Sequence, residues 1–234
     1  MSYSDLKKII LGLAVVFMTA DAFAQQTPLY TMYMWNQLVI NPAYAGSRDA
    51  LTASAVLREQ WVGLDGAPST QVLSVHSPLT NDNIGLGFTV QNDNVGPVNN
   101  TGIWGDFAYR LKVSEKARLS LAMRAGFAIH QADLRNIETG EDGDDAFLNN
   151  VDNNFLPNFG FGAYYYFDRG YLGVSSPSII ENELNNGNNI TGRDAIDLNN
   201  RHYYLLAGYV FNISADSGSV MFKPSTVIRA VNGA

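Results

Sequence analysis

The chain contains no cysteine. This absence excludes disulfide bonds, metal sites built from thiolates, and a lipid attached to an N-terminal cysteine. Charged residues are also scarce, at 16% of the chain against about 25% in typical soluble domains. The fold must therefore be held together without covalent cross-links, and its surface must contain more uncharged residues than that of a typical soluble protein.

Long hydrophobic runs are absent beyond the N-terminus. Lys7 and Lys8 precede an apolar run at residues 9–20, and the small residues Ala22 and Ala24 follow it. This order is typical of a secretory signal peptide, and the run is shorter than the ~20 residues that a membrane-spanning helix needs. We therefore predict a signal peptide at residues 1–24, cleaved near Ala24, and a mature protein that is secreted, periplasmic or in the outer membrane.

The chain has no excess of basic residues, because its formal net charge is −7. Cleavage of the signal peptide removes two acidic and two basic residues, so the net charge of the mature chain is unchanged. A nucleic-acid partner requires a basic face, so we predict none.

Alternating sequence patterns dominate the mature chain, and residues 118–130 give the clearest example. One face of this segment is apolar: Leu119, Leu121, Met123, Ala125, Phe127 and Ile129. The other face carries small and polar residues: Ser120, Ala122, Arg124, Gly126, Ala128 and His130. A period of two predicts a strand, and the apolar face could contact lipid or fill the core of a soluble periplasmic β-sandwich.

Nine segments are predicted as strands: 51–58, 71–77, 84–91, 101–110, 118–130, 158–167, 170–175, 203–213 and 219–231. Most turns between them are short, but residues 135–157 and 179–201 form long connections, which is typical of outer-membrane barrels. The fold class we predict is all-β, an antiparallel transmembrane β-barrel of the outer-membrane type at residues 51–234. Bacterial barrels have even strand numbers, so we expect it to be truncated at the C-terminus. Residues 25–50 are predicted to form a periplasmic strap or plug.

Candidate sites for chemistry are few. The acidic stretch at residues 138–145 could supply calcium ligands, but it does not match the EF-hand spacing, and we interpret it as a solvated extracellular loop. Its candidate ligands are Glu141, Asp142, Asp144 and Asp145. His76, His130 and His202 lack the spacing of a metal site. Ser74 and His76 share one strand face, which leaves an outer-membrane hydrolase as an alternative, but we predict no catalytic, cofactor or metal site.

Two segments near the N-terminus contain distinctive motifs. The first contains Tyr-Met-Trp-Asn at residues 33–36 and Asn-Pro-Ala-Tyr-Ala-Gly-Ser at residues 41–47. The second, at residues 60–70, begins with Gln-Trp and contains two glycines and a proline. Together they resemble the PorP/SprF family of type IX secretion system membrane proteins. The positions that carry the resemblance are Asn41, Pro42, Ala43, Tyr44, Gly46, Gln60, Trp61, Gly63, Gly66 and Pro68.

The resemblance implies an outer-membrane barrel from bacteria of the Bacteroidota type that supports export of surface proteins or gliding adhesins. The implied partners are outer-membrane lipid, the C-terminal domain of a secreted surface protein or adhesin, and periplasmic components of the secretion system. The family brings no catalytic residues and no cofactor. A general porin or solute channel remains an alternative, because the polar, glycine-rich faces of the strands permit a conducting lumen.

Overall fold

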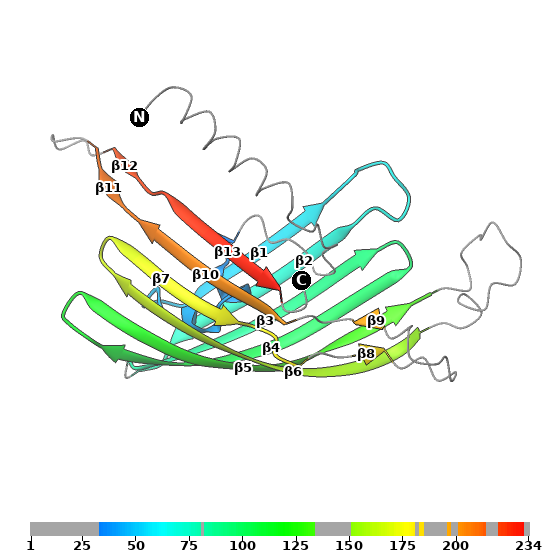
Figure 1. Ribbon diagram of the computed structural model, residues 1–234, viewed down its shortest axis with the longest axis horizontal. Coiled ribbons are helices and arrows are strands. Elements are labelled where there is room, and N and C mark those ends of the chain that lie inside the picture. Colours follow the sequence, from blue (N-terminus) through cyan, green and yellow to red (C-terminus); the bar gives the residue numbers. More distant parts are fainter. Residues whose placement is uncertain are drawn as a thin grey trace, which may run out of the picture.

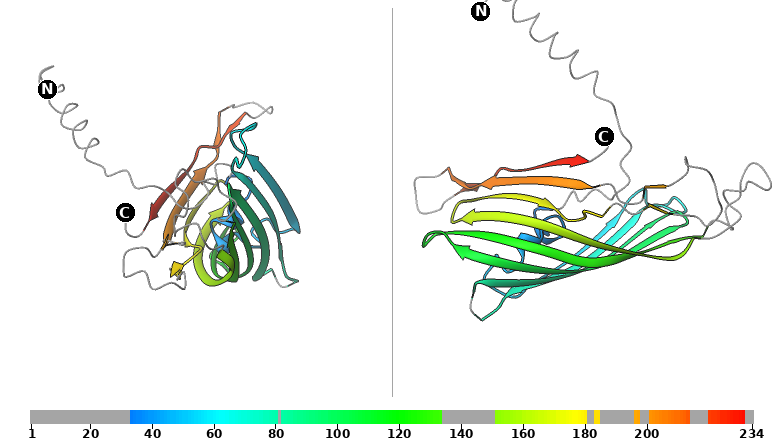
Figure 2. Two further views of the ribbon diagram at one scale, coloured as in Figure 1. Left: turned by 90° about the vertical axis from the view of Figure 1, so that its right-hand side faces the viewer. Right: turned by 60° about the horizontal axis from the view of Figure 1, so that its bottom comes forward.

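The computed structural model describes residues 33–80, 82–133, 151–180, 183–184, 196–197, 201–213 and 220–231. Nine strands within these ranges form one antiparallel sheet, in the order in which they follow one another along the chain. Figure 1 shows them side by side, ending in the red β13. Figure 2 shows the sheet curled into a half-barrel with one concave face.

Each of the nine predicted segments contributes a strand to this sheet, but several strands are longer than predicted. The prediction that residues 135–157 form one long connection was wrong at its end, because β6 already begins at Val151. The strands are β1 (Thr52–Glu59), β2 (Ser69–Pro78), β3 (Ile84–Val95), β4 (Val98–Lys112), β5 (Ala117–Ala132), β6 (Val151–Phe167), β7 (Gly170–Ser176), β10 (His202–Tyr209) and β13 (Ser225–Val231). Two further ladders pair β8 (Glu183–Leu184) with β9 (Ile196–Asp197), and β11 (Phe211–Asn212) with β12 (Met221–Phe222). The prediction of an all-β antiparallel fold is confirmed.

Two of the predicted segments were expected to be continuous strands, and this prediction was wrong. The segment at 203–213 ends its pairing in the main sheet at Tyr209, and the segment at 219–231 is interrupted between Phe222 and Ser225. Pro224 lies in this interruption and has no amide hydrogen to donate to a ladder. Its carbonyl instead accepts from the Tyr209 amide at 3.1 Å. The outer parts of both segments therefore form the separate β11–β12 hairpin.

Burial on the two faces of the sheet is the reverse of that in a soluble protein, because the apolar face is exposed and the polar face is buried. On β5, the apolar residues Leu121 and Met123 are exposed, whereas Ser120, Ala122 and Arg124 are buried on the concave face. The same alternation follows the neighbouring strands, whose buried residues include Thr89, Asp106, Arg110 and Asn158. A soluble β-sandwich would bury its apolar face, so the convex face is that of a barrel wall in lipid.

The height of the apolar band fits a membrane. The outward residues of β5 are apolar from Leu119 to Ile129. With a rise of ~3.3 Å per residue and a strand tilt of ~40°, this run covers roughly 25 Å along the membrane normal. Outer-membrane barrels have an apolar band of about this height.

The connections differ in length at the two ends of the wall. Residues 79–83, 113–116 and 168–169 form short turns at one end, which also carries the β11–β12 hairpin. Residues 60–68, 96–97, 133–150 and 177–201 connect strands at the other end. We refer to these as the short-turn end and the long-loop end.

Candidate functional site

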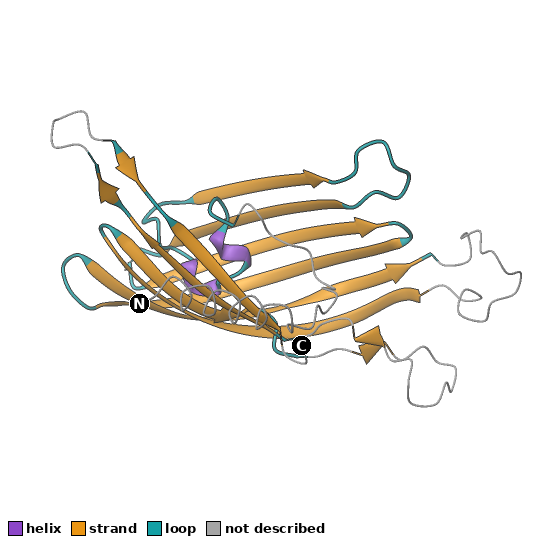
Figure 3. Ribbon diagram, turned by 45° about the horizontal axis from the view of Figure 1, so that its top comes forward, coloured by secondary structure: helices purple, strands orange, loops and turns teal. Residues whose placement is uncertain are grey.

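An inner segment, residues 36–47, precedes β1 and lies against the concave face. It contains two short 3-10 helices, η1 (Gln37–Val39) and η2 (Pro42–Tyr44). Figure 3 shows both helices lying over the sheet between its two edges. Among the described residues, no helix is long and apolar enough to cross a bilayer. Hydrogen bonds and apolar contacts with the wall hold the inner segment in place.

The local sequence explains how η2 begins. Asn41 has an extended backbone, which the following proline favours, and its side-chain oxygen accepts a hydrogen bond from the Ala43 amide at 2.9 Å. Pro42 occupies the first helical position, where no amide hydrogen is needed. The Asn-Pro pair thus encodes the turn that directs the segment along the concave face.

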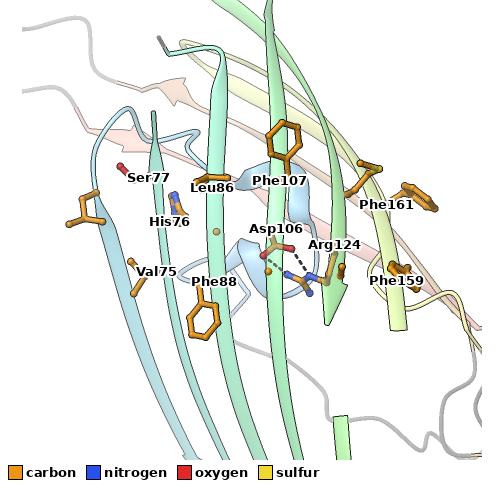
Figure 4. A pocket seen from close by; sticks show the side chains of 15 residues that line it. Val75, His76, Ser77, Leu86, Phe88, Asp106, Phe107, Arg124, Phe159 and Phe161 are labelled. Atoms are coloured by element: carbon orange, nitrogen blue, oxygen red, sulfur yellow. Dashed lines mark hydrogen bonds and ion pairs between the residues drawn. The ribbon is translucent and has the colours of Figure 1, made fainter. Parts of the chain in front are cut away.

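A buried ion pair fixes η1 to the wall. Arg124 of β5 lies 2.6 Å from the carboxylate of Asp106 on β4, and both side chains are buried. The same guanidinium donates to the carbonyl oxygens of Leu38 at 2.6 Å and Val39 at 2.7 Å. Figure 4 shows Asp106 and Arg124 facing one another from neighbouring strands. The last carbonyls of η1, which have no partner within the helix, are satisfied in this way.

A second arginine holds the end of the inner segment. Arg110 is fully buried, donates to the Gly46 carbonyl, and pairs with Asp49 at 2.6 Å. Gly46 has a φ of +73°, and a methyl group there would lie 2.9 Å from the Cα atom of Gly85. Only glycine combines this backbone conformation with such a close approach to the wall.

Hydrogen bonds to β6 and β7 hold the opposite side of the segment. The side-chain amide of Asn41 donates to the Ala163 carbonyl at 3.2 Å, and the Ser175 hydroxyl donates to the Ile40 carbonyl at 2.6 Å. A side chain at Gly162 would overlap Asn41, so this glycine makes room for it. The apolar side chains between these bonds form the core of the molecule, which comprises Leu38, Ile40, Ala43, Tyr44, Ala45, Ala108, Ala122, Tyr164, Tyr171 and Leu206.

The predicted motif positions of the inner segment are therefore brought together in the interior. Asn41, Pro42, Ala43, Tyr44 and Gly46 all lie between the arginines of β4 and β5 and the tyrosines of β6 and β7. The strap or plug was predicted to be periplasmic, and that location stays a prediction.

Ser74 and His76, the residues of the hydrolase alternative, bind the same segment. The Ser74 hydroxyl donates to the Asn36 side chain at 2.8 Å, and the His76 ring accepts from the Gly46 amide at 3.1 Å. Both polar groups thus have partners that hold the inner segment in place. His130 and His202 lie on the concave face of β5 and β10, and the described residues contain no cluster of three groups able to hold a metal.

The second motif forms a loop at the long-loop end, residues 60–68, which we call the motif loop. The Gln60 amide donates to the Pro68 carbonyl at 2.9 Å and closes the loop. The Gly96 amide donates to the Gly66 carbonyl at 2.9 Å and joins the loop to the β3–β4 turn. Gly63 and Gly66 have φ values of +98° and +74°, which explains the two glycines of the motif.

Large apolar side chains of this ordered loop face solvent. Trp61 is 70% exposed, and its φ of +51° is unfavourable for a bulky residue. Val62 and Leu64 are exposed beside it. A cavity of about 410 Å³ lies between the loop and the β3–β4 turn, where it reaches Asn94 and Gly96. Backbone strain of this kind occurs at ligand-binding sites as well as in tight turns.

Sequence reasoning missed the residues that hold the inner segment. Asp106 and Arg110 gave no signal beyond being charged residues at alternate positions of a predicted strand. Arg124 was compatible both with a side chain facing the lumen of a barrel and with one facing solvent in a soluble sandwich. The acidic candidates Glu141, Asp142, Asp144 and Asp145 lie outside the described residues.

Comparison with protein-family models identifies a family for this chain. A family model described as "Type IX secretion system membrane protein PorP/SprF" matches residues 22–234, nearly the whole chain. The search of curated proteins found no match.

Proposed function

Because the chain belongs to the PorP/SprF family of type IX secretion system membrane proteins, we propose that it anchors, or assists the export of, a surface protein handled by that system. In this proposal the chain resides in the outer membrane after its signal peptide is cleaved near Ala24. The long-loop end faces the cell exterior, since the external loops of bacterial barrels are the longer ones. The short-turn end then faces the periplasm, where components of the secretion system could bind.

The exposed apolar residues of the motif loop are the main support for this proposal. The backbone of the loop is fixed by hydrogen bonds at both ends, and yet it exposes Trp61, Val62 and Leu64. Exposed aromatic residues on a rigid element bind a partner at little entropic cost. The occupant we propose is an apolar surface on the C-terminal domain of a secreted surface protein or adhesin.

The inner segment argues against the general porin alternative. Its apolar side chains pack against Ala108, Ala122 and Leu206 of the wall, and two buried arginines hold its carbonyl groups. Open porins have a polar, water-filled lumen. We therefore expect little constitutive conductance in a voltage-clamped bilayer, and a large steady conductance would support the porin alternative instead.

The test of the anchor is recovery of partners from outer membranes. The full-length protein is solubilised from its native membrane and isolated through an affinity tag, together with a Trp61→Ala variant. The matched control is Val113→Ala, which changes an exposed apolar residue at the short-turn end. We expect the unchanged protein and the control to recover a secreted surface protein, and Trp61→Ala to recover at least fivefold less. Recovery of no surface protein and no secretion component would refute the proposal.

A further inference from the structure

A group of amide and hydroxyl side chains lies on the convex face of the wall near the long-loop end. We call it the amide belt, and it consists of Gln71, Asn92, Asn94, Asn99 and Thr101. Asn92 is paired in register with Gln71 on β2 and with Thr101 on β4, while Asn94 is paired with Asn99. Paired residues of antiparallel strands point to the same face. All five side chains therefore share the face of Phe88 and Phe107.

Four members of the amide belt, Asn92, Asn94, Asn99 and Thr101, are ordered by hydrogen bonds to one another. The Asn92 amide donates to Thr101 at 2.8 Å, and the Asn94 amide donates to Asn92 at 2.8 Å. Asn99 donates to Asn94 and accepts from Thr101. An asparagine side chain has two donor hydrogens and an oxygen with two acceptor sites, so Asn94 and Asn99 each keep a donor hydrogen. The belt is thus a preorganised surface with hydrogen-bonding capacity left over.

The position of the belt relative to the membrane is set by the residues below it. On the same three strands the next outward residues toward the short-turn end are Leu73, Val90 and Ile103. These residues begin the apolar band, so the belt lies directly beyond the hydrocarbon region. In an outer membrane with the long-loop end outside, this level is that of the sugar headgroups of the outer-leaflet glycolipid.

The chemistry of the belt selects among headgroups. Phosphate recognition uses arginine or lysine, and the outward positions on β2, β3 and β4 at this level, all within the described ranges, have neither. Neutral amides donate and accept hydrogen bonds in the pattern that sugar hydroxyls require. Asn94 also lines the cavity under the motif loop, which gives a sugar a recess to enter.

We propose that the amide belt binds the neutral saccharide of the outer-leaflet glycolipid and thereby holds the motif loop at a fixed height above the membrane. This inference rests on the proposed function only for the orientation of the barrel.

The test uses the full chain, purified in detergent, and the soluble oligosaccharide obtained by complete alkaline deacylation of the outer-membrane glycolipid, which keeps the sugars that lie next to the hydrocarbon region. The oligosaccharide is used both as isolated and after removal of its phosphates, and binding is measured by titration calorimetry. The variant is Asn92→Leu with Asn99→Leu. The control is Asn83→Leu, an exposed asparagine at the short-turn end. Heat-modifiable migration on gels checks that each variant has folded.

Saturable binding of the dephosphorylated oligosaccharide, weakened at least tenfold in the double variant and unchanged in the control, would support the proposal. No saturable binding, equal binding by all forms, or binding of the phosphorylated form alone would overturn it. If the double variant does not fold, Thr101→Val replaces it, since it removes a hydroxyl and keeps the shape; at least threefold weaker binding is then expected, and unchanged affinity would overturn the proposal. If no saccharide binds but the surface protein is still recovered, the inference fails and the proposed function stands.

Discussion

The guanidinium of Arg124 connects the carboxylate of Asp106, 2.6 Å away on the next strand, to the carbonyl groups of Leu38 and Val39 in the inner segment. One buried cation thus joins two strands of the wall to a segment 85 positions away in the sequence. This contact links the inner segment directly to the barrel wall.

Replacement of Asp106 by asparagine should therefore destabilise the protein strongly. It leaves Arg124 buried without a counter-charge, which typically costs about 3–5 kcal/mol. Urea unfolding of protein reconstituted in liposomes measures the free energy of unfolding. Lys116→Gln is the control, because Lys116 forms an exposed pair with Asp168 at 3.6 Å and such pairs contribute about 0–1 kcal/mol. Equal losses in both variants would contradict the role given to the buried pair.

Gly46→Ala should lower the free energy of unfolding more than Gly96→Ala. Both glycines have positive φ, at +73° and +56°, so both substitutions strain the backbone by about 1–2 kcal/mol. A methyl group at Gly46 would also meet Gly85, whereas one at Gly96 has no neighbour within 4 Å. We expect Gly46→Ala to cost about 1–3 kcal/mol more in the same unfolding assay, as overpacking usually does. A difference near zero would show that the segment does not approach the wall this closely.

Arginine scanning along one strand should locate the membrane boundary. Phe107 lies in the apolar band of β4, and Thr101 lies on the same face in the amide belt. Phe107→Arg should destabilise the barrel in liposomes by about 2–4 kcal/mol, and Thr101→Arg by about 0–1 kcal/mol. The two variants serve as controls for each other, and the reverse order would place the boundary elsewhere.

The cysteine-free sequence allows the orientation to be tested directly. A single cysteine is introduced by Val62→Cys in the motif loop or by Lys116→Cys in a short turn; both positions are exposed. On intact cells, a membrane-impermeant maleimide should label the first variant and leave the second unlabelled until the outer membrane is permeabilised. The opposite pattern would place the motif loop in the periplasm and would remove the basis of both proposals.

The strands were predictable because each carries its own signal. A period of two on residues 118–130 specifies a two-faced strand, and the inverted burial of Met123 and Arg124 confirms that its apolar face is the outer one. The end of the pairing at Tyr209 was not predictable from its own segment. It depends on Pro224, which lies opposite only once the strands are in register.

The inner segment shows the limit of sequence reasoning in this chain. Its motif was recognisable, and Asn41 with Pro42 encodes the turn of η2. Its partners are side chains on other strands, such as Arg110 and Ser175, whose role depends on the curl of the sheet. Curvature and register arise from the whole wall, so no local pattern assigns Arg110 to Gly46.

The inner segment also has a consequence for the order of folding. It is synthesised before every strand of the wall, and yet Asn41 contacts Ala163, which is 122 positions later in the chain. Contacts of such high sequence separation form slowly, because a long loop must be closed before any interaction repays its entropy. The apolar side chains of the segment therefore stay unpaired until β6 and β7 have been synthesised and have folded. During this interval the unfolded chain is prone to aggregation. A holding chaperone that shields residues 36–47 during this interval would therefore favour correct assembly of the barrel.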